Sequence, residues 1–124
     1  MGVGMTVLSA SAAVLNHDSG TYCSWDWGTK LQNGKTYVYA KTTNTSSQSR
    51  YLASGVTVYE DETGTYVISE GANATGGNGT SAEAKVSKGT YPSSSYNFTC
   101  RGYIYGGTNP NSGVIESWGP MNIS

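Results

Sequence analysis

Alternating polar and apolar residues, broken at intervals by turn signals, run through most of this 124-residue chain. Between Lys35 and Thr42, for example, two tyrosines alternate with Val38 and Ala40. A period of two places the two sets of side chains on opposite faces of a β-strand. The pair Asn33-Gly34 just before this segment is a strong hairpin signal, because both residues tolerate a positive φ. The pattern therefore predicts short antiparallel strands joined by tight turns.

The composition supports the same class of fold. Only 12% of the residues are charged, and glycine and tyrosine are abundant, with 17 and 10 residues. Glycine, hydroxyl and β-branched residues disfavour a helix and suit strands and turns. We predict an all-β fold, a single small antiparallel β-sandwich of about seven or eight short strands, with a flattened β-barrel as the alternative. The length suits one domain, which we assign to residues 13–124.

Two local features refine this expectation. Gly55 lies in the middle of the expected strand 50–60 and indicates a β-bulge. Segment 71–80 has no large apolar residue and four glycines, and it is predicted to be an exposed loop.

Cys23 and Cys100 are the two cysteines, and each lies in an aromatic-rich alternating stretch. We predict that they meet across the core as one disulfide, which would stabilise the fold by about 4 kcal/mol in the chain-entropy account. The alternative is two free, buried thiols that act as small hydrophobic groups. Trp25 and Trp27 share a strand face with Cys23, so we expect both indoles to pack in the core.

Residues 1–12 resemble the end of a signal peptide. They carry no charge, and Ala10-Ser11-Ala12 fits the small-residue pattern that precedes cleavage, although no basic residue occurs before Lys30. The alternative is a first strand with Val3, Met5 and Val7 on one face. Together with the predicted disulfide, this segment indicates a secreted or cell-surface protein. No apolar run approaches the roughly 20 residues of a transmembrane helix.

Several functions are not supported by the sequence. The net charge is −1 and the basic residues are scattered, so nucleic-acid binding is not expected. Two cysteines and one histidine cannot close a zinc site, and no cofactor motif is present. His17-Asp18-Ser19 holds the letters of a catalytic triad, but contiguous residues cannot converge as a triad must.

Glu60, Asp61, Glu62 and Glu70 form the one acidic cluster of the sequence. A calcium site and a pair of catalytic carboxylates are both possible for such residues, but a solvated turn is the simpler reading. We therefore predict that the protein is not an enzyme and holds no metal or cofactor.

Tyrosines on the polar face of two expected strands are the candidate binding residues. If strands 50–60 and 96–105 are neighbours, they form an aromatic patch around one arginine. The candidate residues are Tyr51, Tyr59, Arg101, Tyr103 and Tyr105. The alternative is ordinary cross-strand packing of tyrosines on a solvated sheet.

These features favour a non-enzymatic binding module that recognises a protein or glycan partner through exposed aromatic residues. A small secreted toxin or antimicrobial protein is one alternative. A structural subunit of an extracellular filament or coat is another. The sequence leaves the oligomeric state open.

Overall fold

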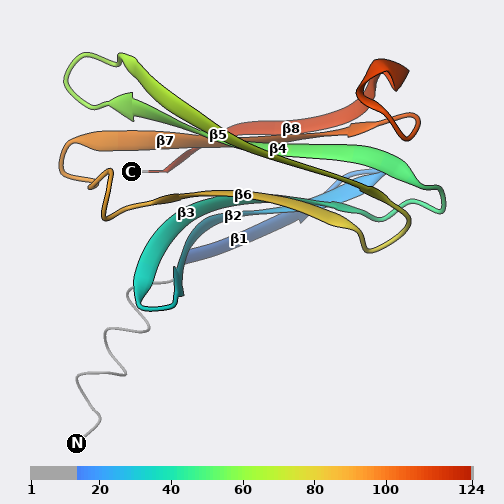
Figure 1. Ribbon diagram of the computed structural model, residues 1–124, viewed down its shortest axis with the longest axis horizontal. Helices are drawn as coiled ribbons and strands as arrows, with labels where there is room; N and C mark the ends of the chain where they lie inside the picture. Colours follow the sequence, from blue (N-terminus) through green and yellow to red (C-terminus); the bar gives the residue numbers. More distant parts are fainter. Residues whose placement is uncertain (1–13, 124) are drawn as a thin grey trace, which may run out of the picture.

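The computed structural model describes residues 14–123, which form eight strands in two four-stranded antiparallel sheets (Figure 1). The first sheet has the order β1-β2-β3-β6, with β1 (Val14–Ser19), β2 (Cys23–Gln32), β3 (Lys35–Asn44) and β6 (Ser81–Ser87). The second has the order β5-β4-β7-β8, with β4 (Arg50–Glu60), β5 (Tyr66–Gly76), β7 (Tyr96–Tyr105) and β8 (Val114–Ile123). A short 3-10 turn, η1 (Pro110–Ser112), is the one helical element of the described chain. The all-β prediction is confirmed, and the layers have a sandwich-like arrangement.

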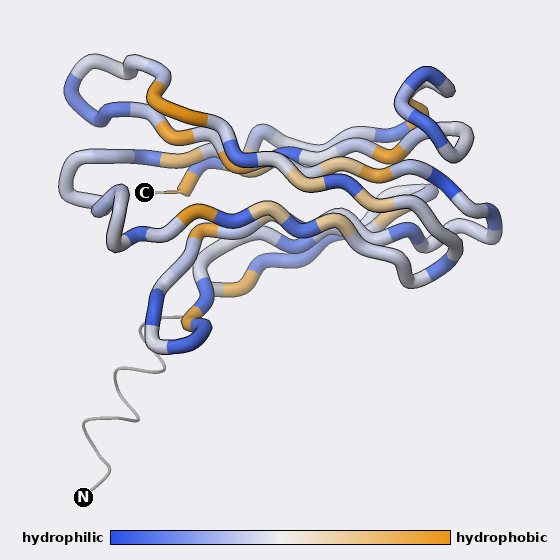
Figure 2. The backbone as a smooth tube through the Cα atoms, viewed as in Figure 1, coloured by the Kyte–Doolittle hydropathy of each residue, from blue (hydrophilic) through white to orange (hydrophobic). Residues whose placement is uncertain are grey.

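The core lies between the two sheets and follows the predicted alternation. Hydrophobic and hydrophilic residues alternate along the strands in Figure 2. The first sheet contributes Val38, Ala40, Ala84 and Val86, and the second contributes Val56, Val58, Phe98 and Cys100. Side chains at every second position of β3, β6, β4 and β7 therefore fill the apolar layer between the sheets. A second, smaller cluster consists of Cys23, Leu52, Ala82 and Ile104.

The tryptophans pack as predicted. The indole of Trp25 stacks on that of Trp118 in β8, with 5.9 Å between centroids and 4° between planes. Trp27 lies 6.0 Å from the same ring in a tilted arrangement. Both β2 indoles thus pack against the core instead of forming an outer binding platform.

The predicted disulfide is wrong, because Cys23 and Cys100 are buried but not bonded. Both thiols point inward, yet at different positions along the sheet. The Cys100 thiol donates to the carbonyl of Tyr39 at 3.4 Å, and Tyr39 is paired with Gly28 in β2. Gly28 is five residues beyond Cys23 on the same strand, which is about 17 Å at the usual rise. A disulfide requires a Cα separation of about 4.4–6.8 Å, so the two cysteines cannot be bonded in this register.

The hairpin between β2 and β3 forms where it was predicted. Asn33 and Gly34 have φ values of 53° and 77°, and Gln32 pairs with Lys35 across them. Two positive φ values in succession match the right-handed twist of the strands, which explains the preference for Asn-Gly at this position.

Two local predictions need correction, and one strand was not predicted. Gly55 lies in regular pairing opposite Gly71, and the register shift of β4 falls instead between Val58 and Tyr59. The predicted loop 71–80 is strand as far as Gly76, because Ala72 and Ala74 continue the inward-facing alternation of β5. Strand β1 was not predicted, since its residues are mostly polar and exposed. Residues 1–12, to which the leader prediction refers, lie outside the described residues.

Candidate functional site

The predicted binding residues lie on the outer face of the second sheet. Strands β4 and β7 are neighbours, with Ala53 opposite Tyr103 and Gly55 opposite Arg101. Directly paired residues point to the same side of an antiparallel sheet, so the outward positions of both strands form one surface. We call this surface the tyrosine face. It consists of Tyr51, Ala53, Gly55, Thr57 and Tyr59 from β4, and Asn97, Thr99, Arg101, Tyr103 and Tyr105 from β7.

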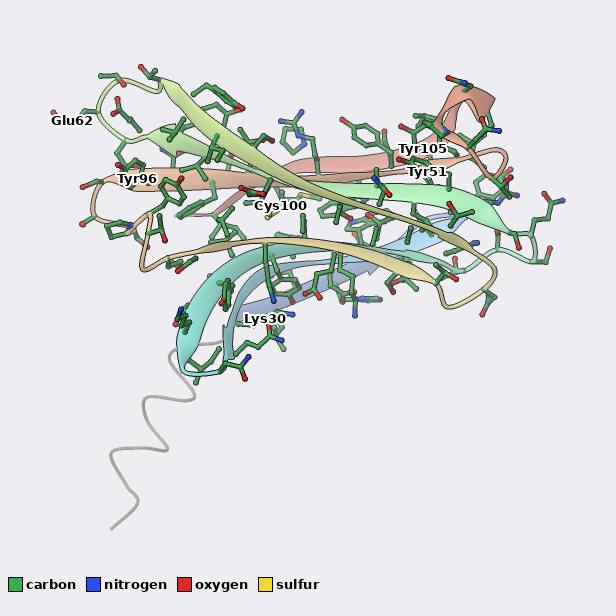
Figure 3. All side chains as sticks on the ribbon, viewed as in Figure 1. Lys30, Tyr51, Glu62, Tyr96, Cys100 and Tyr105 are labelled. Atoms are coloured by element: carbon green, nitrogen blue, oxygen red, sulfur yellow. The ribbon has the colours of Figure 1, made fainter. Side chains whose placement is uncertain are left out.

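One end of the tyrosine face is built on a pair of aromatic rings. Tyr51 and Tyr105 meet edge to face, with ring centroids 5.0 Å apart and planes at 81° (Figure 3). Tyr103, two residues before Tyr105 in β7, lies on the same side of the sheet. Arg50, on the inner side, holds the loop after β7 by donating to the carbonyl of Gly106 at 2.9 Å. Three half-buried tyrosines thus lie together at one end of the sheet, where the Arg50 hydrogen bond holds the neighbouring loop. We call this end the aromatic corner.

Tyr59 belongs to the face but not to this corner. It is eight residues from Tyr51 on β4, or about 27 Å along the strand. Its ring instead contacts that of Tyr66 in β5 edge to face, at a centroid distance of 6.5 Å. Tyr66 is 59% exposed, and sequence reasoning did not select it. The structure therefore divides the predicted patch into two aromatic clusters.

Arg101 lies between the clusters, in a row whose positions on β4 and β5 are both glycine. Gly55 is its partner on β4, and Gly71 is the next residue across on β5. On the other side, a Cβ added to Gly119 would lie 3.0 Å from the Arg101 Cα. The Arg101 Nε is buried and has no hydrogen-bond partner. The arginine thus lies across bare backbone, half-buried and without a counter-ion among the described residues.

Hydroxyl and amide groups occupy the rows beside Arg101. Thr99 and Thr57 form the row on one side, and the Thr57 hydroxyl is 2.9 Å from that of Ser69 in β5. Thr99 is only 9% exposed, and its hydroxyl has no hydrogen-bond partner. The row on the other side continues from Ala53 to Asn73 in β5. The middle of the face is therefore polar but, apart from Arg101, uncharged.

The outer face of the first sheet has the opposite character. His17 Nδ1 lies 2.8 Å from the Asp26 carboxylate, and Lys30 forms an ion pair with Glu83. The Lys30 ammonium also stands over the ring of Tyr39 at 5.1 Å. Burial, with the nearby Asp26 and Glu83 carboxylates, raises the pKa of Tyr39. These groups and Lys41 line an open hollow of about 310 Å³ on the face that carries Lys30 (Figure 3). Both of its carboxylates, Asp26 and Glu83, already have a partner.

The acidic residues do not assemble into one site. Glu60 accepts a hydrogen bond from Thr63, and Asp61 accepts one from Asn97 at the far end of β7. Glu62 is at the exposed tip of the hairpin and, like Tyr96, lines a shallow hollow beside this turn (Figure 3). Glu70 lies on the inward-facing side of β5, opposite Val56. Among residues 14–123, no three His, Cys, Asp or Glu side chains come together as a potential metal site.

Comparison with known proteins does not assign the chain to a family. No family, no curated protein sequence and no solved structure matches it. No membrane-crossing helix is found in the part of the chain that the structure describes.

Sequence reasoning missed two features in and beside the tyrosine face. The first is the row of glycines beside Arg101, which depends on the registers of β5, β4 and β7 together. The second is Tyr66 in β5, whose position opposite Tyr59 follows from the register shift after Val58. The alternation of β4 and β7 did place the five predicted residues on one face.

Proposed function

We propose that this protein is a non-enzymatic binding module, secreted or displayed at the cell surface, that recognises a protein or glycan partner through the tyrosine face. The observation that carries this proposal is the grouping of Tyr51, Tyr103 and Tyr105 with an unpaired Arg101 on one otherwise uncharged surface. Tyrosine and arginine are the residues that recognition surfaces favour most.

The tyrosine hydroxyls support a role in recognition. Within residues 14–123, the hydroxyls of Tyr51, Tyr103 and Tyr105 make no hydrogen bond to another residue. Each ring therefore offers a rigid apolar surface and an unused polar group, and little side-chain entropy is lost when a partner orders it. On the opposite sheet, by contrast, Tyr37 and Tyr39 are each covered by a lysine.

The proposed location depends on the sequence of residues 1–12. Free cysteines remove the disulfide as an argument for an oxidising compartment. Mass spectrometry of the protein recovered from its host would locate the mature N-terminus, and a start near residue 13 in the culture medium is expected. An uncleaved chain retained inside the cell would contradict secretion.

The binding proposal is tested by a double variant of the aromatic corner. Tyr51→Thr combined with Tyr105→Thr removes both rings and puts a β-branched residue, which also suits a strand, in each position. Tyr37→Thr on the opposite sheet is the matched control. Labelled wild-type protein is applied to an array of oligosaccharides and to bacterial, fungal and animal cells, before and after protease or periodate treatment.

We expect saturable binding by wild type and by Tyr37→Thr, and a loss of binding in the double variant. Sensitivity to periodate identifies a glycan partner, and sensitivity to protease identifies a protein partner. The proposal is contradicted if no surface is bound saturably, or if the double variant binds as well as wild type. Growth inhibition without surface binding would favour the toxin, and concentration-dependent polymers in size-exclusion chromatography would favour the filament subunit.

A further inference from the structure

We infer that Arg101 is the anchor for a carboxylate group of an acidic glycan that lies across the tyrosine face. This inference rests on the proposed binding function and adds the chemical class of the ligand.

The first step is that Arg101 is a cation without an internal role. The chain has one other arginine, Arg50, whose guanidinium donates to Ser46 and Gly106 and stands over the ring of Tyr22. The Arg101 guanidinium makes no ion pair or hydrogen bond within the described part of the chain, and its Nε is buried. A buried donor without an acceptor is unfavourable, and an external anion would satisfy it.

The second step is that, within residues 14–123, no carboxylate forms an ion pair with Arg101. Its neighbours across the sheet are Gly55 and Gly71, and those along β7 are Thr99 and Tyr103. Glu70 lies on the inward-facing side of β5, opposite Val56. Asp61 binds Asn97, which is four residues from Arg101 along β7, or about 13 Å. The positive charge is therefore not neutralised locally, and a ligand with a negative charge is complementary to it.

The third step identifies carboxylate as the matching group. A guanidinium presents a planar fork of N–H donors that fits the two oxygens of a carboxylate. Gly55 and Gly71 leave bare backbone next to this fork, so a planar group can lie close to the sheet. A side chain at either position would fill that space.

The fourth step favours a glycan over a peptide. A peptide commonly binds a sheet by pairing with an edge strand, but β4 and β7 are central strands that are already paired on both sides. The face therefore offers no unpaired strand edge, and its polar side chains besides Arg101 are hydroxyls and an amide, next to aromatic rings. Sugar hydroxyls can bond to the first two, and the C–H groups of a sugar ring pack on the electron-rich face of tyrosine.

The test uses two oligosaccharides of the same length that differ in charge. One is an oligomer of hexuronic acid, and the other is the same oligomer with its carboxylates reduced to alcohols. Binding is measured by calorimetry at low ionic strength, where attraction between exposed charges is least screened. A sulfated oligosaccharide and polyglutamate serve as further probes, because they carry the charge on a different group or a different backbone.

We expect wild type to bind the acidic oligomer at least about tenfold more tightly than the neutral one, as for a hydrogen bond to a charged group. Arg101→Gln should abolish this difference, and Arg101→Lys should restore part of it, because lysine keeps the charge but not the fork. Lys41→Gln, on the opposite sheet, should behave as wild type and so controls for total charge.

A second variant separates binding from folding. Gly55→Thr would place its Cβ at ordinary contact distances, 3.7 Å from the Glu70 carbonyl and 4.0 Å from the Arg101 Cγ. Threonine is favoured in strands, so the variant should fold at least as well as wild type. It should nevertheless weaken binding of the acidic oligomer by covering the backbone beside Arg101.

Each contrary result has a distinct meaning. Equal binding of the acidic and neutral oligomers, lost in the Tyr51/Tyr105 variant, overturns the role of Arg101 and leaves the binding module intact. If polyglutamate binds as tightly as the acidic oligomer and loses as much affinity in Arg101→Gln, the ligand is an acidic peptide. If the sulfated oligosaccharide binds more tightly than the hexuronic acid oligomer, the anchored group is a sulfate. Absence of binding to every probe overturns the inference.

Discussion

The thiol of Cys23 in β2 donates a hydrogen bond to the carboxylate of Glu116 in β8, with 3.4 Å between sulfur and oxygen. The same carboxylate accepts the backbone N–H groups of Thr21, Tyr22 and Cys23, at 2.7–3.0 Å. Glu116 comes from one sheet and these donors come from the other. One side chain thus accepts hydrogen bonds from the backbone N–H groups at the turn between β1 and β2, and links this turn to the opposite sheet.

The first prediction concerns the stability that Glu116 provides. Glu116→Gln removes the negative charge and brings an amide N–H₂ group against backbone donors. We expect the free energy of unfolding to fall by about 1–3 kcal/mol, because several hydrogen bonds lose their charged acceptor. Urea denaturation followed by tryptophan fluorescence measures the change. Glu62→Gln, at the exposed hairpin tip, is the control, and equal stability of the two variants would show that the clamp contributes nothing.

The second prediction concerns acid. Desolvation alone would raise the pKa of Glu116, but hydrogen bonds from the Tyr22 and Thr21 N–H groups, and from the Cys23 thiol and N–H, lower it below its ordinary value of 4.5. The unfolded chain therefore takes up this proton first as the pH falls. The contribution of Glu116 is fully present above pH 4.5 and is lost as the pH drops through the folded-state pKa.

Unfolding of wild type and Glu116→Gln, measured from pH 7 down to pH 3, checks the sign of this linkage. The stability difference between them should be constant near neutral pH and shrink in acid. A difference that grows as the pH falls would mean that the pKa of Glu116 is raised.

The third prediction concerns the thiols. Burial raises the pKa of both Cys23 and Cys100 to about 12, with the Glu116 carboxylate adding to the effect at Cys23. Since the thiolate is the reactive form, folded protein should resist iodoacetamide at pH 8, and both residues should react in denaturant. Intact mass should be the same with and without reductant. A loss of two daltons in the non-reduced sample would restore the disulfide.

The cysteines also show what the sequence could and could not provide. Alternation assigned both residues to the inner face, and that was correct. It carries no information on where along the core each one lies, because that depends on which strands pair and in which register. The same limit explains Tyr59, which was placed on the right face and grouped with the wrong tyrosines.

Arg101 illustrates the second limit. The alternating pattern of β7 was enough to predict that Arg101 points outward. It was not enough to predict that the charge of Arg101 is unpaired. That property depends on Gly55 and Gly71, which come from two other strands and meet Arg101 only in the folded sheet. Gly55 was interpreted as a bulge because a glycine inside a strand has several explanations, and only the pairing distinguishes them.

A buried chain of polar groups that joins the two sheets leads to the last prediction. The Trp118 Nε1 donates to the hydroxyl of Thr42 at 2.8 Å, and that hydroxyl is 2.7 Å from Ser54. Ser54 donates in turn to the carbonyl of Ala82 at 2.8 Å. Each group has its partner in another strand, so the chain connects β8, β3, β4 and β6.

Gly102 leaves the space for this chain. A Cβ at this position would lie 2.1 Å from the Thr42 hydroxyl and 2.2 Å from the Trp118 Nε1. We expect Gly102→Ala to lower the free energy of unfolding by more than about 3 kcal/mol, because overpacking adds to the loss of buried hydrogen bonds. Gly55→Ala in the adjacent strand has room for its methyl group and should change stability by less than about 0.5 kcal/mol. If Gly102→Ala does not fold, Thr42→Val isolates the hydrogen bonds and should cost about 1–3 kcal/mol. Thermal unfolding of all variants decides the matter: a Gly102→Ala protein as stable as Gly55→Ala would show that the two sheets are not held at this spacing.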